Sequence, residues 1–314
     1  MHLPDGFLNA ATCAGAGAVA GGAVAWATRK VRIEVGDRLI PLMGVMSACV
    51  FAAQMVNFPI VWGTSGHLIG GVLAAVVLGP WAGMLAMTVV LIVQCFLFYD
   101  GGFTALGANI VNMALAGSLG GYAVYAVILR LIARPAGHVV GAVVASWVSV
   151  ELAAGLCALE LWWSGTYQLD VVLPAMLIVH SFIGIGEALI SGSVVAFLLR
   201  VRPDLLYASR TATYEKSSAR QLAVAGLAVA LFVAFCLAPL ASAAPDGLEH
   251  VAAGLGAAEA VRAPWAIPFA DYQVGGIHAV WLATSLAGVV GTLTVFVLAW
   301  TLSRGVTAHR HDSR

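Results

Sequence analysis

The sequence predicts an all-α polytopic membrane protein, and three observations support this prediction. Of its 314 residues, 61% are hydrophobic and only 10% are charged, whereas soluble domains carry about 25% charged residues. Apolar runs long enough to cross a bilayer, at about 20 residues per helical span, recur along the chain. The 35 glycines are typical of tightly packed membrane helices, because small residues let backbones approach closely.

Roughly nine apolar runs give the expected order of the helices. They cover residues 7–28, 39–58, 66–79, 82–98, 105–133, 139–163, 171–199, 221–243 and 276–302. We expect a bundle of about seven helices over residues 1–200, a polar basic linker over 201–220, and a two-helix unit over 221–314. The run 66–79 is short and rich in glycine, so we expect it to be partly re-entrant.

Basic residues predict the orientation in the membrane. They gather in four clusters that nine spans would place on one side, at Arg29, Lys30, Arg32 and Arg38, at Arg130 and Arg134, at Arg200, Arg202, Arg210, Lys216 and Arg220, and at Arg304 and Arg310. The opposite loops contain almost no Lys or Arg apart from Arg262. Because positive loops stay in the cytoplasm, we expect a multi-pass inner-membrane protein with its N-terminus outside and its C-terminus inside. The formal net charge of zero does not suggest a nucleic-acid partner.

The first two residues form a candidate metal chelate. The α-amine of Met1, the backbone nitrogen of His2 and its Nδ1 atom would close a five-membered and a six-membered ring, both nearly flat because the peptide unit is planar. We expect Met1 to be retained, since its removal usually requires a small second residue. Three coplanar nitrogens with one open corner favour Ni(II) or Cu(II) over Zn(II). The alternative is that His2 is an ordinary solvated residue.

A second imidazole would fill the open corner, and His67 is the best candidate. It follows a loop at residues 57–66 that is rich in glycine and small polar residues, and irregular backbone at membrane depth is tolerated where it lines a site. Asn57 and Ser65 could brace this loop, and Asp5 could orient a ligand as a hydrogen-bond acceptor. The alternatives are that His67 caps a helix, that Asn57 and Ser65 make simple loop bonds, and that Asp5 is a turn residue.

His180 and Glu187 are ionisable residues within an apolar run. They are seven residues apart, so they share one helix face, and such intramembrane groups are functional candidates. They could form a proton or ion path, or lock two helices together. The rival function is therefore a secondary ion transporter or channel that uses His180, Glu187 and Glu151, although no internal repeat of the kind common in such transporters is visible. An intramembrane metalloenzyme is not suggested, because the HExxH pattern is absent.

Four stretches together carry a family resemblance: MHLPDGFLN at the start, NFPIVWGTSGHLIGG around His67, HSFIGIGEALISG around His180, and PDGLEHVA at residues 245–252. The chain resembles the CbiM/NikM family, the substrate-capture components of cobalt and nickel energy-coupling-factor transporters. The likeness covers about residues 1–200, and residues 221–304 resemble the accessory NikN-type subunit.

The resemblance implies a capture-component fold and a metal held in a square plane by Met1, His2 and His67. It also implies a transmembrane coupling subunit and cytoplasmic ABC-type ATPases as partners, with nickel favoured over cobalt. The sequence has no phosphate-binding loop, so we expect a non-enzyme whose partners hydrolyse ATP. The ion would be cargo rather than a cofactor.

Overall fold

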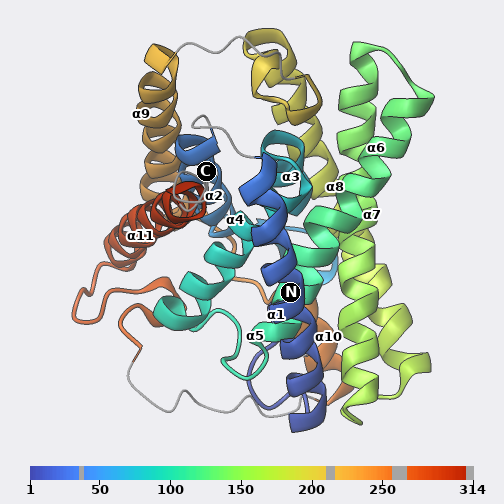
Figure 1. Ribbon diagram of the computed structural model, residues 1–314. Coiled ribbons are helices and arrows are strands. Elements are labelled where there is room, and N and C mark those ends of the chain that lie inside the picture. The colour runs from blue at the N-terminus through green and yellow to red at the C-terminus, as the bar shows by residue number, and fades with distance from the viewer. Residues whose placement is uncertain (35–38, 210–215, 257–266, 309–314) are drawn as a thin grey trace.

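Helices make up most of the chain (Figure 1), as the sequence predicted. The computed structural model describes residues 1–34, 39–209, 216–256 and 267–308. Within these ranges, seven helices are long and apolar enough to cross a membrane. The prediction of an all-α polytopic membrane protein is therefore confirmed. Arg38, Arg210, Arg262 and Arg310 lie outside the described residues.

The elements follow one another in a simple order. In chain order the helices are α1 (Ala10–Glu34), α2 (Leu39–Gln54), α3 (Gly71–Leu78), α4 (Pro80–Val93), α5 (Leu106–Asn109), α6 (Gly121–Leu131), α7 (Pro135–Trp163), α8 (Leu169–Val201), α9 (Lys216–Phe232), α10 (Gly247–Leu255) and α11 (Val280–Ala308). Wider π-helical turns extend α4 (Gln94–Phe98), join α5 to α6 (Ile110–Gly120) and extend α9 (Val233–Leu237). The strands β1 (Phe58–Pro59) and β2 (Ser65–Gly66) pair antiparallel.

Two of the expected spans are shorter than predicted. The run 39–58 forms the 16-residue helix α2, and the run 66–79 forms the eight-residue helix α3. Glycines with positive φ flank α3, Gly70 at 78° and Gly79 at 94°, and only glycine adopts this conformation without strain. After Gly79 the chain reverses, and α4 packs so closely on α3 that a Cβ at Gly83 would lie 2.7 Å from the backbone nitrogen of Ala75.

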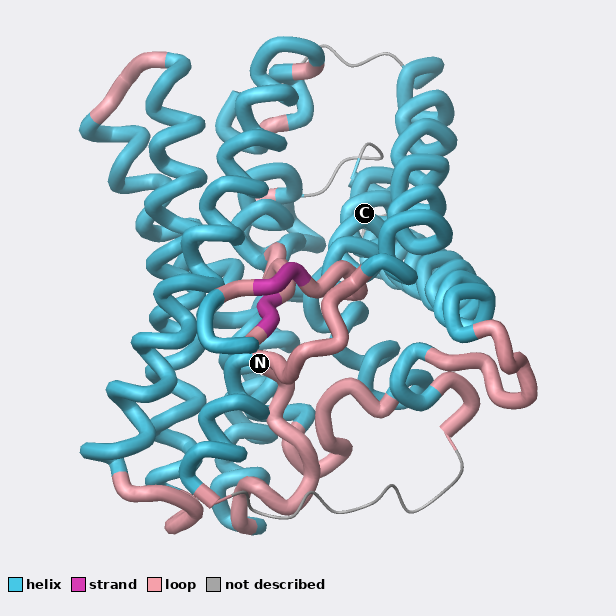
Figure 2. Tube along the Cα trace, turned by 180° about the vertical axis from the view of Figure 1, so that it is seen from behind, coloured by secondary structure: helices cyan, strands magenta, loops and turns pink. Residues whose placement is uncertain are grey.

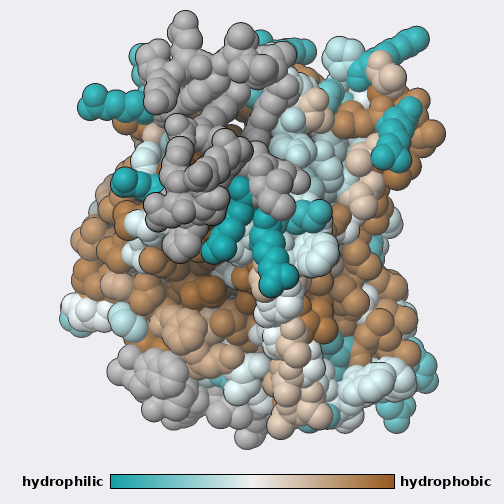
Figure 3. Space-filling view, in the orientation of Figure 1, coloured by the Kyte–Doolittle hydropathy of each residue, from teal (hydrophilic) through white to brown (hydrophobic). Residues whose placement is uncertain are grey.

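The α3–α4 hairpin forms the centre of the bundle, since all eight residues of α3 are buried. In Figure 1 the α6–α7 turn and the C-terminal end of α8 lie at the top, and α1 runs upwards on the same side. The α7–α8 turn and α10 lie at the bottom, and Figure 3 shows a hydrophobic belt between these ends. The orientation in the membrane remains a prediction.

The N-terminal segment and the β1–β2 hairpin meet inside the molecule (Figure 2). The hairpin is held from the C-terminal unit, because the backbone N–H of Ser65 donates to the carbonyl of Pro245 at 2.8 Å. The backbone N–H of Ser242 likewise donates to the carbonyl of Asn57 at 2.8 Å. Segments nearly two hundred residues apart in the sequence therefore frame one site.

Candidate metal centre

The chain begins inside the protein rather than in solvent. Met1 is only 4% exposed and Leu3 is fully buried. The side-chain amide of Asn109 binds Leu3 on both sides, accepting from its backbone N–H at 2.8 Å and donating to its carbonyl at 3.1 Å. The N–H of Gly102 donates to the same carbonyl at 2.8 Å. These bonds fix the backbone directly behind Met1 and His2.

The three predicted ligand residues lie together. The Met1 amine is 3.2 Å from Nε2 of His67, and the rings of His2 and His67 stack with centroids 5.3 Å apart and planes 22° apart. With metal–nitrogen bonds of about 2 Å, neighbouring corners of a square plane lie about 2.8 Å apart. The amine and His67 are therefore close to the separation that two adjacent ligands require.

The hydrogen bond of His67 to the backbone leaves one ring nitrogen available. Its Nδ1 lies 3.0 Å from the carbonyl of Leu68, and a carbonyl only accepts, so Nδ1 carries the hydrogen and donates. Nε2, the atom that faces the Met1 amine, keeps its lone pair. A metal ligand whose other nitrogen is fixed in this way is held in one tautomer and one orientation.

Two carboxylates flank the nitrogens. Asp246, at the N-terminus of α10, accepts from the Met1 amine at 2.5 Å, and Asp100 lies 3.0 Å from Nδ1 of His2. The hydroxyl of Tyr272 donates to the other oxygen of Asp100 at 2.5 Å. Asp246 also caps α10, since its carboxylate accepts from the N–H of Glu249 at 2.9 Å.

Charge and burial set the protonation of the site. Burial alone would lower the pKa of the Met1 amine, but the charge and hydrogen bond of Asp246 raise it above its ordinary value. Burial, with the nearby Met1 amine and His2, lowers the pKa of His67 to about 3. Burial opposes ionisation of Asp100, yet His2 and its other partners hold the pKa of that carboxyl well below its usual range. The site thus pairs a protonated amine with carboxylates and keeps His67 neutral.

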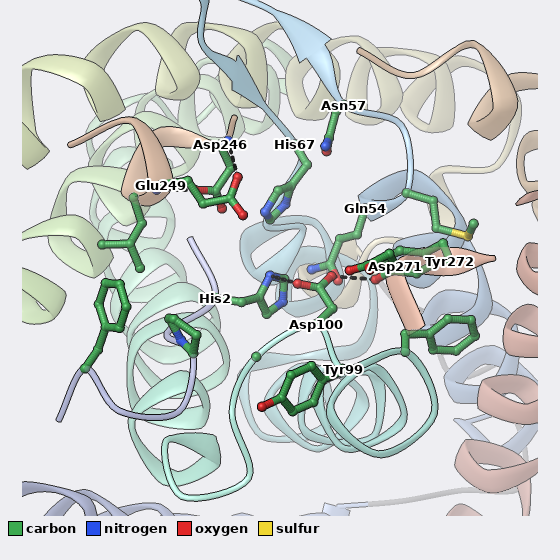
Figure 4. A pocket seen from close by; sticks show the side chains of 16 residues that line it. His2, Gln54, Asn57, His67, Tyr99, Asp100, Asp246, Glu249, Asp271 and Tyr272 are labelled. Carbon is green, nitrogen blue, oxygen red and sulfur yellow. Dashed lines mark hydrogen bonds and ion pairs between the residues drawn. The ribbon is translucent and has the colours of Figure 1, made fainter. Parts of the chain in front are cut away.

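These groups line a cavity of about 300 Å³ that includes His2, His67, Asp100 and Asp246. Figure 4 shows the two histidine rings between the two carboxylates, with Gln54 behind them. In the described part of the chain, no group of three or more His, Cys, Asp or Glu side chains could hold a metal ion. A metal here would therefore need the amine and a backbone nitrogen as ligands beside the two imidazoles.

The other predicted residues lie around this centre in different roles. Asn57 lines the cavity (Figure 4), and the hydroxyl of Ser65 donates to the carbonyl of Ala244 at 2.7 Å, so it joins the hairpin to the C-terminal unit. The carboxylate of Asp5 accepts from the backbone N–H groups of Phe103 and Thr104, at 3.0 and 2.8 Å. Asp5 thereby fixes the loop that follows Asp100.

His180 and Glu187 lie on the buried face of α8 and contact the site's supporting segments. Nδ1 of His180 lies 2.7 Å from the carbonyl of Met176, and its ring packs against Gly247, where a Cβ would meet Nε2 at 2.9 Å. Glu187 accepts from the backbone N–H groups of Ile69 and Gly70, at 2.6 and 2.9 Å. Both side chains bind elements that carry site residues.

Several site residues were not predicted from the sequence: Gln54, Gln94, Asp100, Asn109, Asp246 and Tyr272. The glutamines and Asn109 are isolated polar residues in apolar stretches, and burial at such positions is the signal that could have identified them. Asp246 lies within the PDGLE stretch, which the sequence marked as part of a resemblance without giving it a role in the site.

The fold and the site define a class of protein: a polytopic membrane protein with a buried, nitrogen-rich centre built on its own N-terminus. The sequence matches the family described as “Cobalt uptake substrate-specific transmembrane region”, CbiM, over residues 2–205. It matches the PDGLE domain over residues 220–308. The chain belongs to the CbiM family, with a PDGLE domain following in the same polypeptide.

Relatives from other organisms match this chain over nearly its whole length, including both of its parts. “Putative fused nickel transport protein NikMN” of Archaeoglobus fulgidus is 37% identical over 308 residues, covering 97% of this chain and 98% of the relative. “Fused nickel transport protein NikMN” of Rhodobacter capsulatus is 32% identical over 342 residues, covering 98% of each. A solved structure described as “Crystal Structure of an transition metal transporter” is 37% identical, covers 64% of this chain and 93% of that chain, and superposes with a TM-score of 0.58.

Proposed function

We propose that this chain is the metal-capture component of an energy-coupling-factor transporter that takes up Ni(II). The proposal depends on one observation, the convergence of the Met1 amine, His2 and Nε2 of His67 at a buried cavity, with 3.2 Å between the amine and Nε2. The metal would be held in a plane by the Met1 amine, the backbone nitrogen and Nδ1 of His2, and Nε2 of His67. Residues 1–200 would form the capture domain, 201–220 a linker and 221–314 an accessory unit.

The ligand chemistry supports nickel as the cargo. Four nitrogens in a plane suit Ni(II) and Cu(II), whereas Zn(II) prefers a tetrahedron. The relatives that span the whole chain are named nickel transport proteins, although the family description names cobalt. Asp100 and Asp246 would attract the cation and balance its charge after the ligands lose their protons.

The roles of His180 and Glu187 favour capture over secondary transport. Glu187 accepts from the backbone N–H groups that follow His67, and His180 bonds a carbonyl of its own helix and packs against Gly247. These contacts support a structural role for both residues beside the site. Energy for uphill movement would come from partner ATPases through a coupling subunit, because the sequence has no phosphate-binding loop of its own.

The test is His67→Ala, measured as nickel uptake by cells that express the chain with its partner subunits. We expect uptake to fall to background, because the fourth corner of the plane loses its ligand. His278→Ala is the matched control, since His278 is exposed and does not line the cavity, and it should transport normally. Normal uptake by His67→Ala would refute the proposed site.

A further inference from the structure

Two buried glutamine side chains connect the supports of the two histidines. Gln54 at the end of α2 is 4% exposed, and Gln94 after α4 is fully buried. Nε2 of Gln54 donates to the carbonyl of Ile69 at 2.7 Å, and Nε2 of Gln94 donates to Oε1 of Gln54 at 2.7 Å. Oε1 of Gln94 lies 3.2 Å from Nε2 of His2. The contacts form an unbroken line from the Ile69 peptide to the His2 ring.

One backbone carbonyl fixes the direction of every bond in this line. The carbonyl of Ile69 only accepts, so Gln54 must present its NH₂ group to it and its oxygen to Gln94. Gln94 must then present its NH₂ group to Gln54, which leaves its oxygen facing His2. Nε2 of His2 therefore donates a hydrogen to Gln94. Nδ1, which faces a carboxylate oxygen of Asp100 at 3.0 Å in the empty site, is the nitrogen that a metal would take in place of that contact. This is the nitrogen that closes the six-membered chelate ring with the His2 backbone.

The same peptide also supports His67. The N–H groups of Ile69 and Gly70, two and three residues after His67, donate to the carboxylate of Glu187. Glu187 is fully buried on α8, where a carboxylate is expensive to place unless it has hydrogen-bond partners. It therefore holds both the loop that carries His67 and the carbonyl that orients the glutamines.

We propose that Glu187, Gln54 and Gln94 form a positioning relay that holds both imidazole ligands ready for the metal, with Gln54 setting the orientation of the Gln94 amide. The inference rests on the proposed function, because it assigns these residues to the ligands proposed there. Metal-binding histidines usually donate their second N–H to an acceptor, and loss of that acceptor typically lowers metal affinity about 10-fold to 100-fold.

A double-mutant cycle separates orientation of the Gln94 amide from simple packing. Gln54→Met keeps a similar volume but removes the shorter of the two hydrogen bonds that the Gln94 NH₂ group donates, leaving only the bond to the Tyr272 hydroxyl at 3.3 Å. The Gln94 amide is then held less firmly with its oxygen towards His2, so Ni(II) affinity of the purified full chain should fall about tenfold. In a Gln94→Glu chain both oxygens accept, so the orientation no longer depends on Gln54. There, Gln54→Met should leave the affinity unchanged or raise it.

Two further variants complete the design. Gln94→Met removes the acceptor itself and should weaken binding about as much as Gln54→Met, which provides a second route if one variant does not fold. Ser47→Ala, on the same helix as Gln54, removes another buried polar group whose hydroxyl has no hydrogen-bond partner and should not change the affinity.

The outcomes are distinguishable. A wild-type chain that binds no Ni(II) would overturn the proposed function. A wild-type chain that binds Ni(II), with Gln54→Met weakening binding equally in both backgrounds or not at all, would overturn the relay alone. The relay is supported if Gln54→Met weakens Ni(II) binding in the chain that retains Gln94 but not in the Gln94→Glu chain.

Discussion

The Met1 amine is the group on which the site depends most at the scale of single residues. It lies between a proposed ligand, Nε2 of His67 at 3.2 Å, and a carboxylate, Asp246 at 2.5 Å. A protonated amine has no lone pair for a metal, so Asp246 and the cargo compete for opposite forms of the same nitrogen. Asp246 would attract the cation by its charge, but it also holds the proton that the amine must release before a metal can bind.

Asp246→Asn should therefore shift nickel binding to lower pH. In the wild type Asp246 raises the pKa of the amine, so the proton persists to higher pH and the metal binds half-maximally there. Without this charge, burial lowers the pKa, and the midpoint of Ni(II) binding against pH should fall by about one unit. Asparagine still caps α10, so the helix is preserved. A midpoint that stays fixed or rises would show that Asp246 does not hold the proton.

Met1, His2 and His67, which the sequence proposes as ligands, lie together in the structure, whereas the residues around them were not predicted. Met1, His2 and His67 could be proposed because ring sizes and a family resemblance both point to them. Asp100, Gln54 and Gln94 could not, because a polar residue at the end of an apolar run has no local pattern that reveals its partner. Their roles depend on the relative placement of α2, α4 and the N-terminal segment.

At the scale of elements, α10 delivers Asp246 to the site by packing on α8. Gly247, the first residue of α10, lies where an added Cβ would be 2.8 Å from Cε1 of His180 and 2.8 Å from Cδ1 of Ile183. A side chain at this position would displace either α10 or the α8 side chains against which it packs. The close approach of α10 and α8 is therefore what places Asp246 beside the amine.

Gly247→Val should lift α10 from α8 and imitate the loss of Asp246. We expect faster amide hydrogen exchange across residues 247–255 and a lower pH midpoint for Ni(II) binding. Gly254→Ala is the control on the same helix, because nothing lies within 4 Å of a Cβ at Gly254. Equal exchange rates in the two variants would mean that the His180 contact does not seat α10.

The lengths of the helices were harder to predict from the sequence than their existence. The apolar runs predicted the existence of the helices, but hydrophobicity alone does not distinguish a spanning helix from a short buried one. Helix α3 begins after Gly70 and ends before Gly79, because the positive φ angles of these two glycines interrupt an otherwise continuous apolar stretch. The glycine content of this run predicted an irregular segment. It did not predict that α3 and α4 would pack against each other as a hairpin.

At the scale of the whole molecule, the bundle and the C-terminal unit share one centre. The bundle supplies His2, His67 and Asp100, and the PDGLE stretch supplies Asp246. The sequence predicted two units but not that they meet at the candidate metal site, because contacts between distant segments leave no trace in local composition.

The chain alone should bind nickel without moving it. Reconstituted in liposomes without partner subunits, it should show Ni(II) bound to protein but no accumulation in the lumen, because the sequence has no phosphate-binding loop. Addition of the coupling subunit, ATPases and ATP should start transport. Gradient-driven uptake by the chain alone would instead identify a secondary transporter.

Anomalous scattering at the nickel edge from crystals of the loaded chain tests the central claim most directly. The account predicts one strong peak about 2 Å from each of four atoms: the Met1 amine, the backbone nitrogen and Nδ1 of His2, and Nε2 of His67. A peak coordinated by the carboxylate oxygens of Asp100 and Asp246, with the Met1 amine still bound to Asp246, would contradict it.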